Sequence, residues 1–383
     1  MRTAKLKDIT LTITDGKHGD CKNHDGSGYY FISCKDVYDE TIHYENARQI
    51  TEDDFRDADR RTNLAAYDIL ITNSGTIGRM ALVKDIPETR KTTFQKSVAI
   101  VRADTSQVVP NYLYYLLKSK VHDFINSSNG SAQKNLLLST MRDFDISFVD
   151  SFETQHRIAS ILSRYDSLIE NYQKQIKLLE EAAQRLYKEW FVDLRFPGHE
   201  NTNIIDGVPE GWTPSLLGQL AEFKRGKTIT KKDVIDGDIP VVAGGLEPAY
   251  YCNKSNTAER VITISGSGAN AGFTRMYFEK VWASDCSFVD ASVTPFLHFV
   301  YCFLKNNKTT IDNLQKGAAQ PHVYAKDINS LSICIPIESV LKSFEEKVSN
   351  YFDTTASLQS QLRLLTEARD RLLPKLTNGE MEI

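Results

Sequence analysis

A single uninterrupted stretch, residues 152–191, constrains this chain more than any other part of it. It contains neither proline nor glycine, and apolar side chains recur along it every seven residues, with a second set four residues later. This spacing predicts an amphipathic α-helix whose apolar stripe is wide enough to form a buried seam. At 1.5 Å per residue such a helix is about 60 Å long. It cannot bury its own stripe, so it requires a partner.

A second helix near the C-terminus is the expected partner. Residues 361–372 repeat residues 175–186 with seven of twelve positions identical, and these identities argue against two unrelated amphipathic helices. We predict that the helices pack through the following heptad positions: Ile158, Tyr165, Tyr172, Leu179, Leu186, Phe344, Tyr351, Leu358, Leu365 and Leu372. Two matched helices half a chain apart indicate a duplicated unit, in which a globular part precedes a long helix.

The two globular parts repeat a common order of segments. In the first part, Pro110 opens a short helix over 111–118, and strands are expected at 6–13, 29–33, 68–72 and 97–101; a glycine turn precedes residues 79–83, and residues 144–148 come last. In the second part, Pro295 opens the corresponding helix, and the matching segments are 217–220, 264–272, 287–290, 317–323 and 331–336. The chain is therefore predicted to contain a domain at 1–150, a long helix at 151–196 capped by Asp150 or Ser151, a linker at 197–212, a domain at 213–336 and a helix at 337–377.

Composition and charge limit the classes of function. The net charge is −4, from 46 basic and 50 acidic residues, so nucleic-acid binding would require local basic patches or basic partners. The six cysteines are scattered without metal-ligand spacing and are expected to be buried thiols in a reducing cytosol. We expect a cytoplasmic protein, because no signal peptide and no apolar run long enough to cross a membrane is visible.

Motifs for independent catalysis are missing from the sequence. It contains no GxxxxGK phosphate loop, no Asn-Pro-Pro-Tyr-like turn and no strand-linked GxGxxG. Residues 266–272 are rich in glycine, but a lone turn of this kind more often closes a hairpin than binds a nucleotide. Asp53-Asp54 and Glu345-Glu346 are expected on solvated surfaces. We therefore expect no catalytic residues and no metal site.

Loops rich in Lys, Arg, Asn, Gln, Ser and Thr suit contacts with nucleic acid, because such side chains bind phosphates and base edges. The candidates in the first half are Lys17, His18, Lys22, Asn73, Ser74, Thr76, Arg79, Gln133, Lys134 and Asn135. Those in the second half are Lys224, Arg225, Lys227, Ser265, Ser267, Asn270, Arg275, Gln320, His322 and Tyr324. For any single residue, closing a turn is an equal alternative. The aromatic helices near residues 112–117 and 296–303 are expected in the core.

These features together resemble the specificity (S) subunit of type I restriction-modification systems. The resemblance covers essentially the whole chain and rests on its order of domains and helices. It also rests on Thr72-Asn-Ser-Gly-Thr-Ile-Gly-Arg79 and Gly130-Ser-Ala-Gln-Lys-Asn-Leu136, which look like the family's two signature segments. The second half departs from both, with Ser265-Gly-Ser-Gly-Ala and Gly317-Ala-Ala-Gln-Pro-His.

The resemblance implies an α+β fold with two β-rich target recognition domains. Two long helices, packed as an antiparallel coiled coil, would separate them and give an approximate two-fold internal repeat. Each domain would recognise one half of a split, asymmetric site in double-stranded DNA. Two modification (methyltransferase) subunits would bring S-adenosylmethionine, and two restriction subunits would bring ATP and Mg²⁺. A coiled-coil adaptor for proteins and an enzyme with unrecognised chemistry are the two alternatives.

Overall fold

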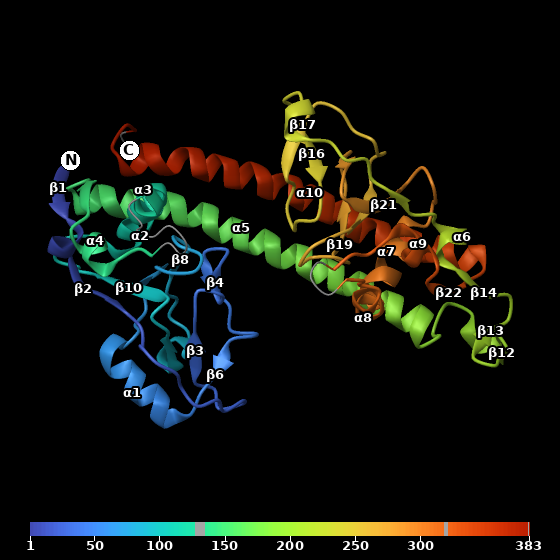
Figure 1. Ribbon diagram of the computed structural model, residues 1–383, viewed down its shortest axis with the longest axis horizontal. Coiled ribbons are helices and arrows are strands. Elements are labelled where there is room, and N and C mark those ends of the chain that lie inside the picture. Colours follow the sequence, from blue (N-terminus) through green and yellow to red (C-terminus); the bar gives the residue numbers. More distant parts are fainter. Residues whose placement is uncertain (127–134, 318–320, 382) are drawn as a thin grey trace. The chain divides into compact units, whose positions relative to one another are not determined.

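The structure is a computed structural model that describes residues 1–126, 135–317, 321–381 and 383. It contains two compact units, one of residues 1–170 with 363–383 and one of residues 171–362. Each unit combines a globular part with one section of each of two long helices, α5 (Phe152–Tyr187) and α10 (Glu338–Thr377) (Figure 1). The fold is therefore α+β, and neither unit is complete without both helices.

The first unit is built on a four-stranded antiparallel sheet in the order β2-β10-β7-β8. Its strands are β2 (Thr10–Asp15), β10 (Val98–Ala103), β7 (Ile69–Thr72) and β8 (Met80–Leu82). Shorter pairings surround this sheet: β1 (Arg2–Lys5) with β11 (Asp145–Phe148), β4 (Val37–Tyr38) with β5 (Thr41–Ile42), and β6 (Arg48–Gln49) with β3 (Tyr30–Ile32) and β9 (Thr92–Phe94). The helices are α1 (Glu52–Thr62), α2 (Pro110–Ser119), α3 (Val121–Asn126) and α4 (Leu138–Arg142).

The second unit repeats this topology with different residues. Its main sheet has the order β15-β21-β18-β19, formed by β15 (Lys224–Arg225), β21 (Cys286–Asp290), β18 (Val261–Ser265) and β19 (Thr274–Tyr277). The smaller pairings are β14 (Thr213–Leu216) with β22 (Ser332–Ile335), and β17 (Tyr250–Cys252) with β16 (Ile239–Val242) and β20 (Trp282–Ala283). Strand β16 pairs parallel with β20, just as β3 pairs parallel with β9. The helices are α6 (Leu217–Leu220), α7 (Leu297–Asn306), α8 (Lys308–Asn313) and α9 (Ala325–Asn329).

Sections of α5 and α10 pack together within each unit and join its hydrophobic core. In the first unit Ile158 and Leu162 of α5 lie in one buried cluster with Leu373 and Leu376 of α10. In the second unit Ala183, Tyr187 and Trp190 share a cluster with Phe344 and Val348. All ten predicted heptad residues are buried or half-buried. Burial of these apolar side chains, at about 25 cal/mol per Å², is the main term holding the helices together.

Several expected elements differ from the observed ones. The strand predicted at 6–13 is confirmed only from Thr10 onward, because a 3-10 turn at Leu6–Ile9 separates β1 from β2. Leu6 and Ile9 are both fully buried, and a 3-10 turn places residues three apart on the same side. The helix predicted over 111–118 is confirmed as α2, which begins at Pro110. The long helix begins at Phe152, where the backbone N–H of Thr154 donates to Ser151 Oγ at 3.3 Å.

The segment expected to be a linker carries structure of its own. Regular α-helix in α5 ends at Tyr187 and continues as a π-helical turn to Val192. Residues 197–212 then include a 3-10 turn at His199–Asn201 and a hairpin of β12 (Ile204–Ile205) and β13 (Val208–Pro209). The rings of Phe196 and Trp212 lie 4.9 Å apart in the core of the second unit. The segment is mostly polar and was therefore predicted to be a linker, but Phe196 and Trp212 fix its two ends in the core.

Candidate nucleic-acid interface

Two predicted segments that are distant in sequence meet in the first unit. The turn after β7 begins at Asn73, whose carbonyl oxygen accepts from the N–H of Leu136 at 2.8 Å. Ser74 forms an isolated β-bridge with Asn135. Gly78 has φ +85°, and a Cβ there would lie 2.9 Å from Cγ1 of Val121, so this turn requires glycine. The turn at 73–79 and residues 135–136 thus form one continuous surface.

The same two segments meet in the second unit. The N–H of Val323 donates to the carbonyl oxygen of Gly266 at 3.1 Å, and the N–H of Gly268 donates to that of Pro321 at 3.0 Å. Ser267 and His322 form the isolated β-bridge that corresponds to the bridge between Ser74 and Asn135. The structure therefore brings together both pairs of segments that sequence order alone had matched.

The candidates in the first unit differ widely in accessibility. Thr76, Arg79 and Asn135 are exposed, and Ser74 is half-exposed. Asn73 is 8% exposed, and its side-chain oxygen has no hydrogen-bond partner in the part of the chain that the structure describes. Gln133 and Lys134 lie outside the described residues. The exposed candidates can contact a ligand directly, whereas Asn73 is buried within the turn.

The candidates in the second unit also divide into structural and accessible groups. Ser265 is buried and donates to the carbonyl oxygen of Gly244 at 3.1 Å, whereas Ser267 donates to Asp285. Arg275 donates to the carbonyl oxygen of Leu246 at 2.9 Å and lies over the ring of Tyr277. These side chains already have protein partners.

Other candidates in the second unit face solvent. The imidazole of His322 stacks on the ring of Tyr324, which is 39% exposed, with the ring centres 6.0 Å apart. Asn270 is half-exposed, and Lys224, Arg225 and Lys227 are exposed. Gln320 lies outside the described residues. Lys326 Nζ lies 5.9 Å from the centre of the Tyr324 ring, and an accessible aromatic ring beside a cation is a suitable surface for bases and phosphates.

A Gly-Lys dipeptide occupies equivalent positions in both units, which sequence reasoning did not detect. The N–H groups of Gly16 and Lys17 donate to the carbonyl oxygens of Val98 and Phe94 at 3.2 and 2.8 Å. Those of Gly226 and Lys227 donate to Cys286 and Ala283 at 2.8 and 2.9 Å. A Cβ would lie 2.0 Å from the Phe94 oxygen at the first glycine and 2.3 Å from the Ser284 oxygen at the second. Close backbone approach therefore requires glycine at both places, and the shared dipeptide was the available signal.

Ion pairs hold the basic candidates of the first unit against its own carboxylates. Lys17 Nζ lies 2.9 Å from Asp57 Oδ2, and this hydrogen bond raises the pKa of Lys17 and lowers that of Asp57. His18 Nε2 lies 2.9 Å from Asp15 Oδ2. The ammonium group of Lys22 is exposed, whereas its backbone N–H donates to Asp54 at 2.7 Å. The charge of Lys17 is therefore partly neutralised within the unit, whereas no ion pair of the Lys22 ammonium is seen among the described residues.

Neither a metal site nor a membrane-spanning helix is seen among the described residues. No group of three or more His, Cys, Asp or Glu side chains that could hold a metal ion occurs there. No helix in the described part of the chain is long and apolar enough to span a bilayer.

Comparisons with known proteins agree with this duplicated architecture. Two repeated units with the same sheet order and unlike turn residues define a class of protein with two distinct recognition surfaces. Residues 3–181 and 209–365 match the type I restriction modification DNA specificity domain. The chain belongs to this family, and the match does not favour the coiled-coil adaptor.

Relatives of similar length include the type I restriction enzyme MjaIX specificity subunit of Methanocaldococcus jannaschii. It is 29% identical over 94% of this chain and 89% of its own length. The HindI specificity subunit of Haemophilus influenzae is 21% identical over 74% of this chain and 80% of its own. The fold is similar to that of a crystal structure of the S subunit from M. genitalium, with a TM-score of 0.60, 18% identity and coverage of 98% and 96% of the two chains.

Proposed function

We propose that this chain is the DNA-recognition subunit of a type I restriction-modification complex, with no chemistry of its own. One observation carries the proposal: both units bring the same pair of segments together on the same sheet topology, yet with different side chains. The first turn runs Asn-Ser-Gly-Thr-Ile-Gly-Arg from 73 to 79, and the second runs Gly-Ser-Gly-Ala-Asn-Ala-Gly from 266 to 272. Two unlike surfaces on one scaffold suit a bipartite, asymmetric DNA site.

The long helices support a fixed spacing between the two half-sites. Half-sites one helical turn apart lie roughly 34–36 Å from centre to centre on B-DNA. Both α5 and α10 contribute residues to each unit, so they connect the two recognition surfaces covalently. Removing four residues, about 5.4 Å of helix, from one of them should change the preferred spacer in methylation mapping. An unchanged site with full activity would contradict this role.

A repeated exposed surface on the helices supports two copies of one protein partner. Leu178 is 52% exposed, and its counterpart in the sequence repeat, Leu364, is 58% exposed. Glu181, three residues after Leu178, pairs with Arg185. Their counterparts in the repeat, Glu367 and Arg371, also pair with each other. Identical exposed side chains are not required for packing, so their repetition points to repeated recognition.

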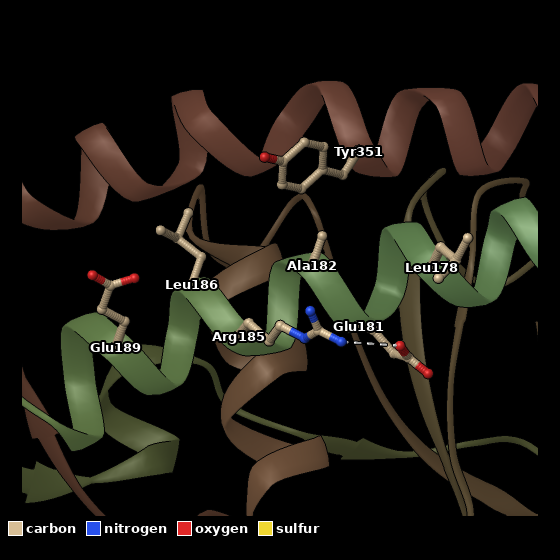
Figure 2. Close-up of a pocket in the computed structure, with 7 residues that line it drawn as sticks. All are labelled: Leu178, Glu181, Ala182, Arg185, Leu186, Glu189 and Tyr351. Atoms are coloured by element: carbon tan, nitrogen blue, oxygen red, sulfur yellow. Dashed lines mark ion pairs between the residues drawn. The ribbon is translucent and has the colours of Figure 1, made fainter.

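A shallow groove of about 290 Å³ lies beside this surface in the second unit, between α5 and α10 (Figure 2). Figure 2 shows Leu178, Ala182 and Leu186 along α5, with Tyr351 of α10 across from them. An apolar row bordered by the Glu181–Arg185 pair suits an amphipathic helix of a partner. We therefore assign the repeated surface to two modification subunits, which would supply S-adenosylmethionine. Two restriction subunits would supply ATP-driven translocation and cleavage.

Exchange of one recognition domain is the decisive test. Residues 213–335 are replaced by the equivalent residues of a relative with a different site, and the complex with modification subunits is assayed by methylation mapping. One half of the recognised sequence should change, and the other half should persist. If both halves changed together, the two units would not be independent recognition domains.

A second assay tests whether the chain has chemistry of its own. The isolated chain is mixed with S-adenosylmethionine and substrate DNA, and the same mixture with modification subunits serves as the positive control. Methyl transfer is expected only in the second mixture. Transfer by the isolated chain would contradict a purely DNA-recognising role.

A further inference from the structure

One short segment of the second unit concentrates positive charge. Residues 224–232, here named the basic strip, read Lys-Arg-Gly-Lys-Thr-Ile-Thr-Lys-Lys and contain five cations and no acid. All five cationic side chains are exposed. No ion pair joins any of them to a carboxylate among the described side chains, which include Asp236 and Asp238 but not Asp233. Free cations on one surface are the usual mark of a polyanion site.

The backbone of the basic strip is held firmly although its side chains are free. The indole Nε1 of Trp282 donates to the carbonyl oxygen of Lys227 at 2.7 Å, and the hydroxyl of Tyr250 donates to that of Ile229. The N–H of Gly226 is in addition hydrogen-bonded to β21 of the main sheet, and the N–H of Lys227 to β20 of the smaller sheet. A fixed backbone presents the cations at a defined place, which lowers the entropy lost when a ligand binds.

The basic strip lies at the same end of the sheet as the recognition turn. Gly226 donates to the carbonyl oxygen of Cys286, and Cys286 is paired in the sheet with Ser265, the last residue before the turn. Gly266, the first residue of the turn, donates to the carbonyl oxygen of Asp285 at 3.1 Å. A duplex on the turn would therefore place its phosphates near the strip.

The equivalent segment of the first unit carries balanced charge. The sheet registers match Arg225 with Asp15, and Lys227 with Lys17. Residues 14–22 contain two lysines and two aspartates. Lys17 pairs with Asp57 at 2.9 Å, and Asp15 accepts from Arg61 at 2.6 Å. Equivalent positions thus carry free cations in one unit and compensated charges in the other.

We infer that the basic strip binds DNA phosphates and that the two units contribute unequally to DNA affinity. The second unit supplies much of the salt-dependent, sequence-independent attraction, and the first unit supplies little of it. This inference rests on the proposed function, because it requires that the chain binds a duplex. The inference goes beyond that function by naming the unit that attracts DNA through charge and the residues that make these contacts.

The test compares two equivalent lysines. Lys227→Gln and Lys17→Gln are each assembled with modification subunits, and binding to specific and scrambled duplexes is followed by fluorescence anisotropy from 50 to 300 mM KCl. Loss of one phosphate contact lowers the slope of log K against log[salt] by about 0.9 and weakens binding roughly eightfold at 0.1 M salt. We expect this change for Lys227→Gln on both duplexes and no change for Lys17→Gln.

A double variant, Lys231→Gln with Lys232→Gln, checks the same inference away from the sheet. Its slope should fall by about 1 to 2, with equal losses on specific and scrambled DNA. Tryptophan fluorescence during urea unfolding confirms that the variants of the second unit are folded, and hydrogen exchange of the β10 amides does so for Lys17→Gln. The double variant decides the matter if Lys227→Gln proves unstable.

The possible outcomes separate the inference from the function on which it rests. A wild-type complex that shows no preference for specific DNA would contradict the proposed function. A normal wild type with equal slopes for Lys17→Gln and Lys227→Gln, or with an unchanged slope in the double variant, would overturn the inference alone. Weaker assembly with modification subunits, together with an unchanged slope in the complex that still forms, would mean that the strip binds an acidic partner protein, which also overturns it.

Discussion

Arg369 of α10 offers the sharpest test of how the first unit is held together. The side chain is nearly buried, and its Nη1 lies 2.9 Å from Glu40 Oε2 and 2.8 Å from Asp166 Oδ1. Burial alone would lower the pKa of Arg369, but the carboxylates of Glu40 and Asp166 outweigh burial and raise it. Glu40 lies at the turn between β4 and β5, and Asp166 lies on α5, so one guanidinium joins three elements.

The cost of removing this guanidinium follows from what remains. Breaking a buried ion pair by deleting one partner typically costs about 3–5 kcal/mol. The carboxylates here are 32% and 26% exposed, and each keeps one partner: Lys118 for Glu40 and the hydroxyl of Tyr115 for Asp166. We therefore expect Arg369→Met to lower the free energy of unfolding of the first unit by about 2–3 kcal/mol.

A nearby arginine provides the matched control. Arg371 pairs with Glu367 on the same helix, but its side chain is 76% exposed. Exposed pairs contribute little, so Arg371→Met should change stability by less than about 0.5 kcal/mol. The two variants remove the same group two residues apart and differ mainly in burial.

The assay must report on the first unit alone. All three tryptophans, at 190, 212 and 282, belong to the second unit, so tryptophan fluorescence does not follow the first. Hydrogen exchange of the β10 amides (Val98–Ala103), read by mass spectrometry, reports opening of the first unit. Protection should fall roughly 30- to 150-fold in Arg369→Met and stay within about threefold in Arg371→Met. A loss below fivefold, or equal losses in both variants, would refute the reasoning.

Three further predictions concern the second unit. Burial raises the pKa of the Cys286 thiol to about 12. The stability contributed by the neutral thiol is therefore complete below pH 9 and is lost as the pH rises from 9 to 12. Cys286→Ser should reduce this alkaline loss of stability in urea unfolding followed by fluorescence. Gly226→Ala should cost more than about 2 kcal/mol because its Cβ meets the Ser284 oxygen, whereas Gly268→Ala, at φ +80° in open space, should cost about 1 kcal/mol in the same assay. Leu178→Asp should leave unfolding unchanged and weaken capture of modification subunits at least tenfold in a pull-down, and unchanged capture would exclude this surface as the docking site.

Periodic and ordered features of this fold could be predicted from the sequence. The heptad spacing located both long helices, because burial of a repeated apolar stripe depends on local spacing. Pro110 located α2 for an equally local reason. Helix α1 was not predicted, because its few apolar residues give a weak periodic pattern, although Thr51 followed by three acidic residues is a local signal for its start.

The candidate site was predictable only in outline. The paired turn segments could be matched because their order repeats along the chain. The partners of individual side chains could not be predicted, since Arg275 donates to the carbonyl oxygen of Leu246 and Lys17 pairs with Asp57 through long-range contacts. The equivalence of the two Gly-Lys dipeptides was hidden because their flanking residues diverged while the backbone geometry persisted.

The first unit contains two segments that are far apart in the sequence, residues 1–170 and 363–383. Its completion on the ribosome therefore does not follow the order in which the two globular parts are synthesised. Residues 1–170 emerge first, yet Leu373 and Leu376 of their core emerge last. At 5–20 residues per second, the early segment waits roughly 10–40 s for its final helix. All of the second unit leaves the ribosome within that interval. The N-terminal domain is therefore the later of the two to mature, and nascent chains that stop near residue 360 should carry one finished domain and one exposed, chaperone-dependent half.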